Sequence, residues 1–141
     1  MKCNIFIISL LLFFLFHCGS PDFIIDNSRT EESTLSIIYF FPTTDYSKGI
    51  KADMPIVFIF SENIDVDSAL KGLSIEKTGP GQRQNVKPRC NYNETEYMLQ
   101  CLPESGRWDL KSNYSIKIKD VKSRDGTKVL DKEYSYTFST I

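Results

Sequence analysis

The sequence predicts an all-β sandwich, and two observations carry that prediction. From Leu35 onward, apolar and polar residues alternate in short segments, which is the pattern of strands that bury one face. Clusters of glycine, proline, asparagine and aspartate separate these segments, and almost no helical periodicity occurs among them. The region is long enough for one domain with a single stable core.

The first half of this region predicts three strands and one helical turn. A strand runs from Leu35 to Phe41, with its odd-numbered residues on one face. After a polar connection, Pro55–Phe60 is apolar on both faces and therefore suits a central strand. Residues Asp65–Lys71 predict the helical turn. Leu73–Glu76 predicts a third strand, followed by the turn-forming residues Gly79–Gly81.

The second half predicts a hairpin and two further strands. Gln84–Tyr92 and Glu96–Leu102 pair as the two arms of the hairpin. Tyr114–Ile118 and Tyr134–Ser139 alternate between apolar and polar residues, and Arg124–Thr127 between them is a strong turn signal. About seven short strands at this spacing indicate an immunoglobulin-like β-sandwich.

The N-terminus resembles a bacterial lipoprotein signal. An apolar run from Ile5 to Phe16 is too short to span a bilayer but fits the core of an export signal. Leu15 and Cys18 match the lipobox pattern, in which the cysteine thiol is acylated and becomes the new N-terminus. Phe16 and His17 are bulkier than the usual residues, as in the looser lipoboxes of spirochaetes. The alternative is a plain secretory signal with an incidental cysteine.

These features divide the chain into a lipoprotein signal peptide at 1–17, a polar tether at 18–33 and a domain at 34–141. With two or three acyl chains, palmitate among them, attachment to the membrane is durable. We therefore expect a membrane-anchored protein of the cell envelope. The expected place is the outer membrane, on its surface or on its periplasmic face.

The composition argues against two classes of function. The chain has 17 Lys and Arg against 18 Asp and Glu, a net charge of -1, which argues against a nucleic-acid partner. Its single histidine, His17, lies in the segment expected to be removed, which excludes histidine-based catalysis and most zinc or copper sites. No nucleophile motif is present either, so we expect no enzyme and no cofactor.

Four motifs in order resemble the bacterial Ig-like domain first described in S-layer proteins. The similarity runs from about Ser36 to Ile141, and its motifs are Pro42–Asp45 with Gly49–Ile50 and Pro55–Asp65, then Leu110–Ile118, Val121–Gly126 and Tyr136–Thr140. The resemblance implies an extracytoplasmic β-sandwich of structural, spacer or adhesive type, without family-wide catalytic residues. One departure is the pair Cys90 and Cys101, which the family pattern does not include.

Cys90 and Cys101 lie in the two arms of the predicted hairpin. A loop of about four residues, Glu94–Tyr97, places them directly opposite each other. A disulfide persists in an exported protein and stabilises a closed loop of this size by about 2–3 kcal/mol. A reactive or metal-binding thiol pair is the alternative, but no histidine or second thiol pair lies nearby.

Arg107 and Trp108 form the candidate partner-binding site. Both types of residue are common where interfaces are tightest, so an exposed Trp108 beside Arg107 would be a binding anchor. The other interpretation is that Trp108 folds back and caps the end of the sandwich core.

Two groups of charged residues have a functional and a structural interpretation. Asp and Glu cluster near turns and could hold calcium, but aspartate also favours such turns by bonding its own backbone. These residues are Glu62, Asp65, Asp67, Asp120 and Asp125. Lysines on the polar face of one strand and its ends could meet an acidic partner or lipid headgroups, but a charged, solvated sheet edge explains them better. These are Lys111, Lys117, Lys119 and Lys122.

The leading hypothesis is a lipid-anchored envelope protein whose domain is a non-catalytic binding, adhesion or structural module. Its partners are expected to be the membrane, through the N-terminal lipid, and another protein or envelope component. The alternative is a periplasmic protein inhibitor or assembly subunit that acts through loop contacts. The fold alone does not decide between them.

Overall fold

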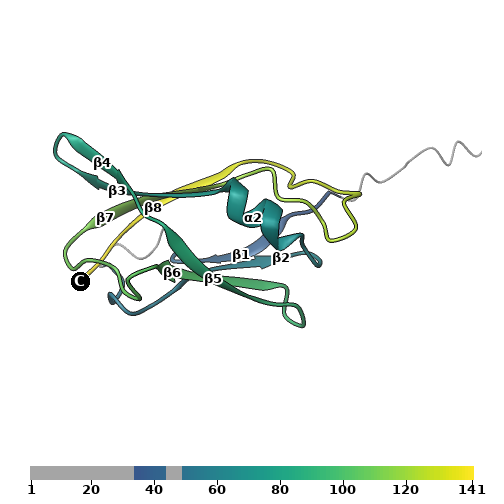
Figure 1. The fold of residues 1–141 in the computed structure, drawn as a ribbon, viewed down its shortest axis with the longest axis horizontal. Coiled ribbons are helices and arrows are strands. Elements are labelled where there is room, and N and C mark those ends of the chain that lie inside the picture. The colour runs from purple at the N-terminus through teal and green to yellow at the C-terminus, as the bar shows by residue number, and fades with distance from the viewer. Residues whose placement is uncertain (1–33, 44–48) are drawn as a thin grey trace, which may run out of the picture. The chain divides into compact units, whose positions relative to one another are not determined.

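The computed structural model describes residues 34–43 and 49–141, which form two four-stranded antiparallel sheets packed face to face (Figure 1). The β2 sheet contains, in spatial order, β1 (Ile37–Phe41), β2 (Ile56–Phe60), β6 (Met98–Pro103) and β5 (Pro88–Asn93). The β7 sheet contains β4 (Gln82–Asn85), β3 (Leu73–Gly79), β7 (Asn113–Ile118) and β8 (Tyr134–Ser139). The all-β sandwich is therefore confirmed, with eight strands in the described part. The signal peptide, the tether and Cys18 lie outside the described residues.

The core lies between the sheets, where the period-2 pattern of the strands places alternate side chains. In β2, Ile56, Phe58 and Phe60 are fully buried, while Val57 and Ile59 are half-buried on the outer face. This pattern confirms the prediction of a central strand that is apolar on both faces, since β2 pairs with β1 on one side and β6 on the other.

The predicted face of the first strand is wrong because β1 contains a bulge. Ile37 pairs with Phe60, but Tyr39 pairs with Ile59, so one extra residue is inserted between them. The bulge moves Tyr39 to the outer face, where it is 47% exposed. Phe40 turns inward instead, and its ring lies 4.9 Å from that of Tyr136.

The predicted strand Gln84–Tyr92 is also corrected, because it is divided between the two sheets. The Val86 N–H donates to the Ile75 carbonyl, which extends the β3–β4 pairing by one residue. The carbonyl of the next residue, Lys87, accepts instead from the N–H of Glu104, which directly follows β6 of the β2 sheet. Since the two neighbouring residues bond to different sheets, the chain crosses the sandwich at this point.

The predicted helical turn is α2 (Val66–Gly72). The Asp65 carboxylate caps it by accepting from the Asp67 N–H at 3.3 Å. Its last residue, Gly72, contacts the chain just after β7, where the Lys119 N–H donates to the Gly72 carbonyl. The helix therefore closes the sandwich beside the start of β3.

The prediction that the lysines of β7 and its ends defend a sheet edge is wrong. β7 pairs with β3 on one side and β8 on the other, so it is a central strand. Lys117 is exposed on its outer face, and Lys119 follows the strand's end. These side chains are exposed because the outer face of the sheet faces solvent.

The domain has two distinct ends. At the entry end, Leu35 bridges to Leu130, and α2 lies beside the same end in Figure 1. The strand β3 begins there at Leu73 and runs away from it. At the opposite end, which we call the distal end, the β3–β4 hairpin projects beyond the rest of the sandwich (Figure 1). The described chain therefore enters at one end, and the hairpin marks the other.

Candidate functional site

An open cleft of about 230 Å³ lies at the distal end, beneath the inner face of the β3–β4 hairpin. The hairpin and the crossover to β5 form one wall, and the turn that follows β6 forms the other. The lining residues are Lys77, Gln84, Asn85, Val86 and Lys87 on the first wall, with Pro103, Glu104, Ser105, Arg107 and Asp109 on the second and Tyr114 between them. The distal cleft, as we call it, is lined mostly by polar and charged side chains.

Two ion pairs connect the walls of the distal cleft. Lys77 Nζ lies 2.8 Å from the Asp109 carboxylate, and this hydrogen bond raises the pKa of Lys77. Lys87 Nζ lies 3.1 Å from the Glu104 carboxylate. Both carboxylates of the cleft are therefore already paired with lysines.

Arg107 is the remaining cation of the cleft. Its side chain is exposed, and it makes no hydrogen bond or ion pair with any residue that the structure describes. The turn that carries it is held by a hydrogen bond of 2.9 Å from Ser105 Oγ to the Arg107 carbonyl. A free guanidinium at the mouth of a cleft is suited to bind a carboxylate.

Three aromatic rings form the floor beneath the cleft. Trp108 contacts Tyr114 at 4.9 Å and Phe138 at 5.1 Å between ring centroids, both edge to face. Tyr114 stacks on Phe138 at 5.1 Å. Burial raises the pKa of Tyr114, whose hydroxyl accepts from the Asp109 N–H at 3.0 Å. The rings therefore fix the position of the wall that carries Asp109.

The structure distinguishes the two interpretations of Trp108, because its side chain is fully buried. Its Nε1 donates to the Met54 carbonyl and its main-chain N–H to the Ala52 carbonyl, both at 2.8 Å. Trp108 is thus the core cap, and the expectation of an exposed anchor is corrected for this residue. Arg107, its neighbour, does face solvent at the cleft.

Cys90 and Cys101 form the predicted disulfide, with their Cα atoms 4.1 Å apart. They face each other in the β5–β6 hairpin, whose loop is Glu94–Tyr97 as expected. Pro103, two residues beyond Cys101, lines the distal cleft. The cross-link therefore joins the two strands that lead into the cleft.

Of the acidic residues near turns, Asp125 and Glu62 have partners within the domain. Asp125 accepts hydrogen bonds from Ser123 Oγ and from the Thr127 N–H and Oγ1, which lower its pKa to about 2. Glu62 pairs with Lys128 at 2.9 Å. Within residues 34–43 and 49–141, no group of three or more acidic, cysteine or histidine side chains is placed to hold a metal ion.

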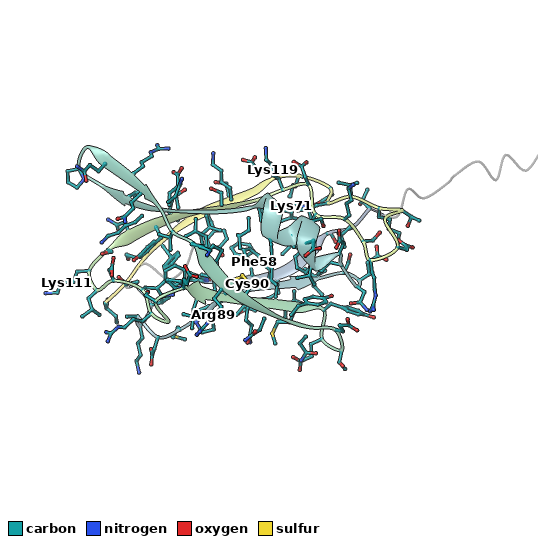
Figure 2. The ribbon with its side chains drawn as sticks, in the orientation of Figure 1. Phe58, Lys71, Arg89, Cys90, Lys111 and Lys119 are labelled. Carbon is teal, nitrogen blue, oxygen red and sulfur yellow. A yellow bond between two sulfur atoms is a disulfide. The ribbon has the colours of Figure 1, made fainter. Side chains whose placement is uncertain are left out.

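A second hollow of about 310 Å³ lies beside α2. Lys71, Lys119 and Lys122 line it together with Asp65 and Asp120. Figure 2 shows Lys71 and Lys119 on the α2 side of the domain. Since its lining carries both lysines and aspartates, this hollow does not favour a ligand of either charge.

Sequence reasoning found Arg107 but missed Lys77 and Lys87. Lys77 lay just beyond the predicted third strand, which the structure extends to Gly79. Lys87 lay inside a strand that the structure divides in two. The turn signal at Gly79–Gly81 would have placed Lys77 opposite Gln84, had it been taken as a hairpin.

No family model and no curated protein matches the chain. Solved structures do. The N-terminal part of the bacterial S-layer protein SbsC has a TM-score of 0.51 and 15% identity, over 75% of this chain and 24% of that one. The S-layer protein rSbsC(31-844) has the same TM-score and 14% identity, over 75% and 13% of the two chains. The native α-2-macroglobulin of E. coli (ECAM) has a TM-score of 0.53 and 17% identity, over 77% and 6%.

These likenesses establish the fold, a β-sandwich of the kind found in SbsC. The chain spans about a quarter of the first of these proteins and less of the others. The more specific resemblance, to the bacterial Ig-like family, stays a prediction from the sequence motifs. Among the described residues, no helix is long and apolar enough to cross a membrane.

Proposed function

We propose that this chain is a lipid-anchored protein of the bacterial cell envelope whose domain binds another protein through the distal cleft, without catalysing a reaction. Acylated Cys18 attaches it to the membrane, and residues 18–33 serve as the tether. The domain presents the cleft to its partner.

One observation carries the proposal: the distal cleft lies at the end opposite to the entry of the chain. The described part of the chain begins at the end where Leu35 bridges to Leu130. The cleft and its unpaired Arg107 lie at the other end, under the projecting hairpin. A module attached at one end and charged at the other is suited to reach a partner away from its attachment.

The chemistry of the cleft supports binding rather than catalysis. The carboxylates of Glu104 and Asp109 are paired with lysines. The one hydroxyl on the second wall, Ser105 Oγ, donates to a main-chain carbonyl rather than to a base. A nucleophile needs an adjacent base to become reactive.

Protease accessibility tests the anchoring and the location. We expect added protease to digest the domain on intact cells, which would place the cleft outside and favour adhesion. Protection until the cells are lysed would instead favour the second candidate, a periplasmic inhibitor or assembly subunit. The variant Cys18→Ala should leave the membrane fraction, and if it fractionates like the wild type, the lipoprotein assignment fails.

A further inference from the structure

Strand β4 has an open edge. It pairs with β3 on one side, and no strand in the described part of the chain pairs with its other side. Hydrogen-bonded and non-hydrogen-bonded pairs alternate along an antiparallel ladder. Because the Val86 N–H donates to the Ile75 carbonyl, these two residues form a hydrogen-bonded pair of the β3–β4 ladder. Counting back from Val86 in alternation, Asn85 and Arg83 occupy non-hydrogen-bonded positions. Their N–H and C=O groups therefore point away from β3, toward solvent.

The other three edge strands carry features that obstruct pairing, whereas β4 is protected only by its length of four residues and by Arg83. β1 contains the bulge after Ile37, and β5 begins with Pro88, which has no N–H to donate. The end of β8 is covered by Ile50, which donates to the Ser139 carbonyl and accepts from the Ile141 N–H. β4 has the sequence QRQN, with no proline, no lysine and no bulge. Its edge is thus the one best suited to receive another strand.

The charge around this edge favours an acidic occupant. Arg107 has no ionic partner in the described residues, and Lys111 beyond the cleft is likewise exposed without one. Figure 2 shows Lys111 at the distal end of the domain. The carboxylates that line the cleft, Glu104 and Asp109, are already paired with lysines, and Glu76 on β3 lies 3.5 Å from Arg83 on β4. A second copy of this chain would bring like charges together, whereas an acidic strand would meet opposite charge.

We propose that an extended, acidic segment of another protein adds to the β7 sheet along the free edge of β4 and places carboxylates in the distal cleft. This deepens the proposed function, on which it rests, by naming the chemistry of the partner. The main-chain groups of Arg83 and Asn85 hold the added strand. Because successive side chains of a strand alternate between its faces, every second residue enters the cleft, where Arg107 binds its carboxylate.

Fluorescence anisotropy on the full chain in detergent micelles tests this. The probe is a labelled octapeptide of alternating Glu and Thr, and the same peptide with Lys in place of Glu is its control. We expect the Glu peptide to bind at least about tenfold more tightly than the Lys peptide at low salt. We expect Arg107→Glu to lower the affinity for the Glu peptide by at least about fivefold. Equal affinity for the two peptides, or binding of neither, overturns the proposal.

A proline at position 83 separates strand addition from simple charge attraction. Arg83→Pro removes an outward N–H but no hydrogen bond to β3, and Arg83→Ala removes the same side chain while keeping the N–H. We expect Arg83→Pro to bind the Glu peptide about threefold to tenfold more weakly than Arg83→Ala does. This loss of affinity corresponds to the free energy of one hydrogen bond. The circular dichroism spectra and unfolding midpoints of both variants confirm that the β3–β4 hairpin is intact.

The outcomes distinguish this inference from the function on which it rests. If Arg107→Glu abolishes binding but Arg83→Pro and Arg83→Ala are equal, the cleft binds its partner without strand addition, and only the inference fails. If ultracentrifugation shows a dimer that Arg83→Pro dissociates, the edge belongs to a second copy and the inference is overturned. Failure of the lipid anchoring is measured separately, by the fractionation of Cys18→Ala.

Discussion

The indole Nε1 of Trp108 donates a hydrogen bond of 2.8 Å to the main-chain carbonyl of Met54. This bond joins the segment before β2 to the turn after β6, which are 54 positions apart in the chain. Because Arg107 precedes Trp108 directly, the bond also fixes the position of the second wall of the distal cleft at Arg107.

Trp108→Phe should therefore destabilise the domain even though it remains aromatic. It leaves the partly buried Met54 carbonyl without its donor, which costs about 1–3 kcal/mol. Trp108→Ala should cost about 3–5 kcal/mol, because it also leaves a cavity. Urea unfolding measures both, and the exposed neighbour Arg107→Ala should change the free energy of unfolding by less than about 0.5 kcal/mol. An unchanged midpoint for Trp108→Phe would show that the bond does not hold the core.

Removal of the disulfide should lower stability without changing the fold. The bond closes a loop between residues 11 positions apart, so the double variant Cys90→Ala/Cys101→Ala should lose about 2–3 kcal/mol. Urea unfolding with and without a reducing agent measures this. The reductant should lower the midpoint of the wild type and leave that of the double variant unchanged. A midpoint of the wild type that does not respond to reduction contradicts the prediction.

Gly72→Ala should be strongly destabilising. A Cβ at this position would lie 1.9 Å from the Lys119 carbonyl oxygen, so the end of α2 and the end of β7 would have to separate. Overpacking of this kind costs typically about 1–3 kcal/mol, and more where the obstacle is backbone. Gly79→Ala is the matched control, because no atom lies within 4 Å of its Cβ position. Thermal unfolding of the two variants should separate them clearly, and equal midpoints would refute the close approach.

Asp125 should make the stability of the domain depend on pH in acid. Its hydrogen bonds from Ser123 and Thr127 lower its pKa from 3.8 to about 2. A carboxyl group with a lowered pKa adds stability above its unfolded-state pKa and loses it as the pH falls through its folded-state pKa. We therefore expect this contribution to be complete above about pH 5 and to disappear between about pH 4 and 2.

Urea unfolding at a series of pH values checks this, with Asp125→Ala as the variant. Its midpoint should fall less than that of the wild type between those pH values. Asp53→Ala serves as the control, since Asp53 is exposed and its carboxylate makes no hydrogen bond within the described residues. If the wild type and Asp125→Ala lose stability in parallel, the turn does not depend on the charged carboxylate.

Strands with a regular pattern could be predicted from the sequence. In β7 and β8 each alternating residue faces the side that its polarity requires, so the period alone located both strands. The Cys90–Cys101 pairing followed from the length of the hairpin loop. In these places, local sequence and tertiary structure require the same conformation.

The parts that failed depend on tertiary contacts with no local signal. The bulge in β1 brings Phe40 against Tyr136, a residue that lies 96 positions later in the chain (136 minus 40). The division of the predicted strand at Val86 and Lys87 depends on which sheet supplies each hydrogen bond. The distal cleft could not be predicted for the same reason, since its walls meet only after that crossover.

The tip of the β3–β4 hairpin has a consequence for how this protein can change over generations. Gly79, Pro80 and Gly81 are all exposed, and the four residues of β4 that follow contribute nothing to the core. Substitutions there leave the sandwich intact, so selection for folding acts weakly on them. We expect sequence variation among close relatives to concentrate at this end, where residues can change without rebuilding the domain.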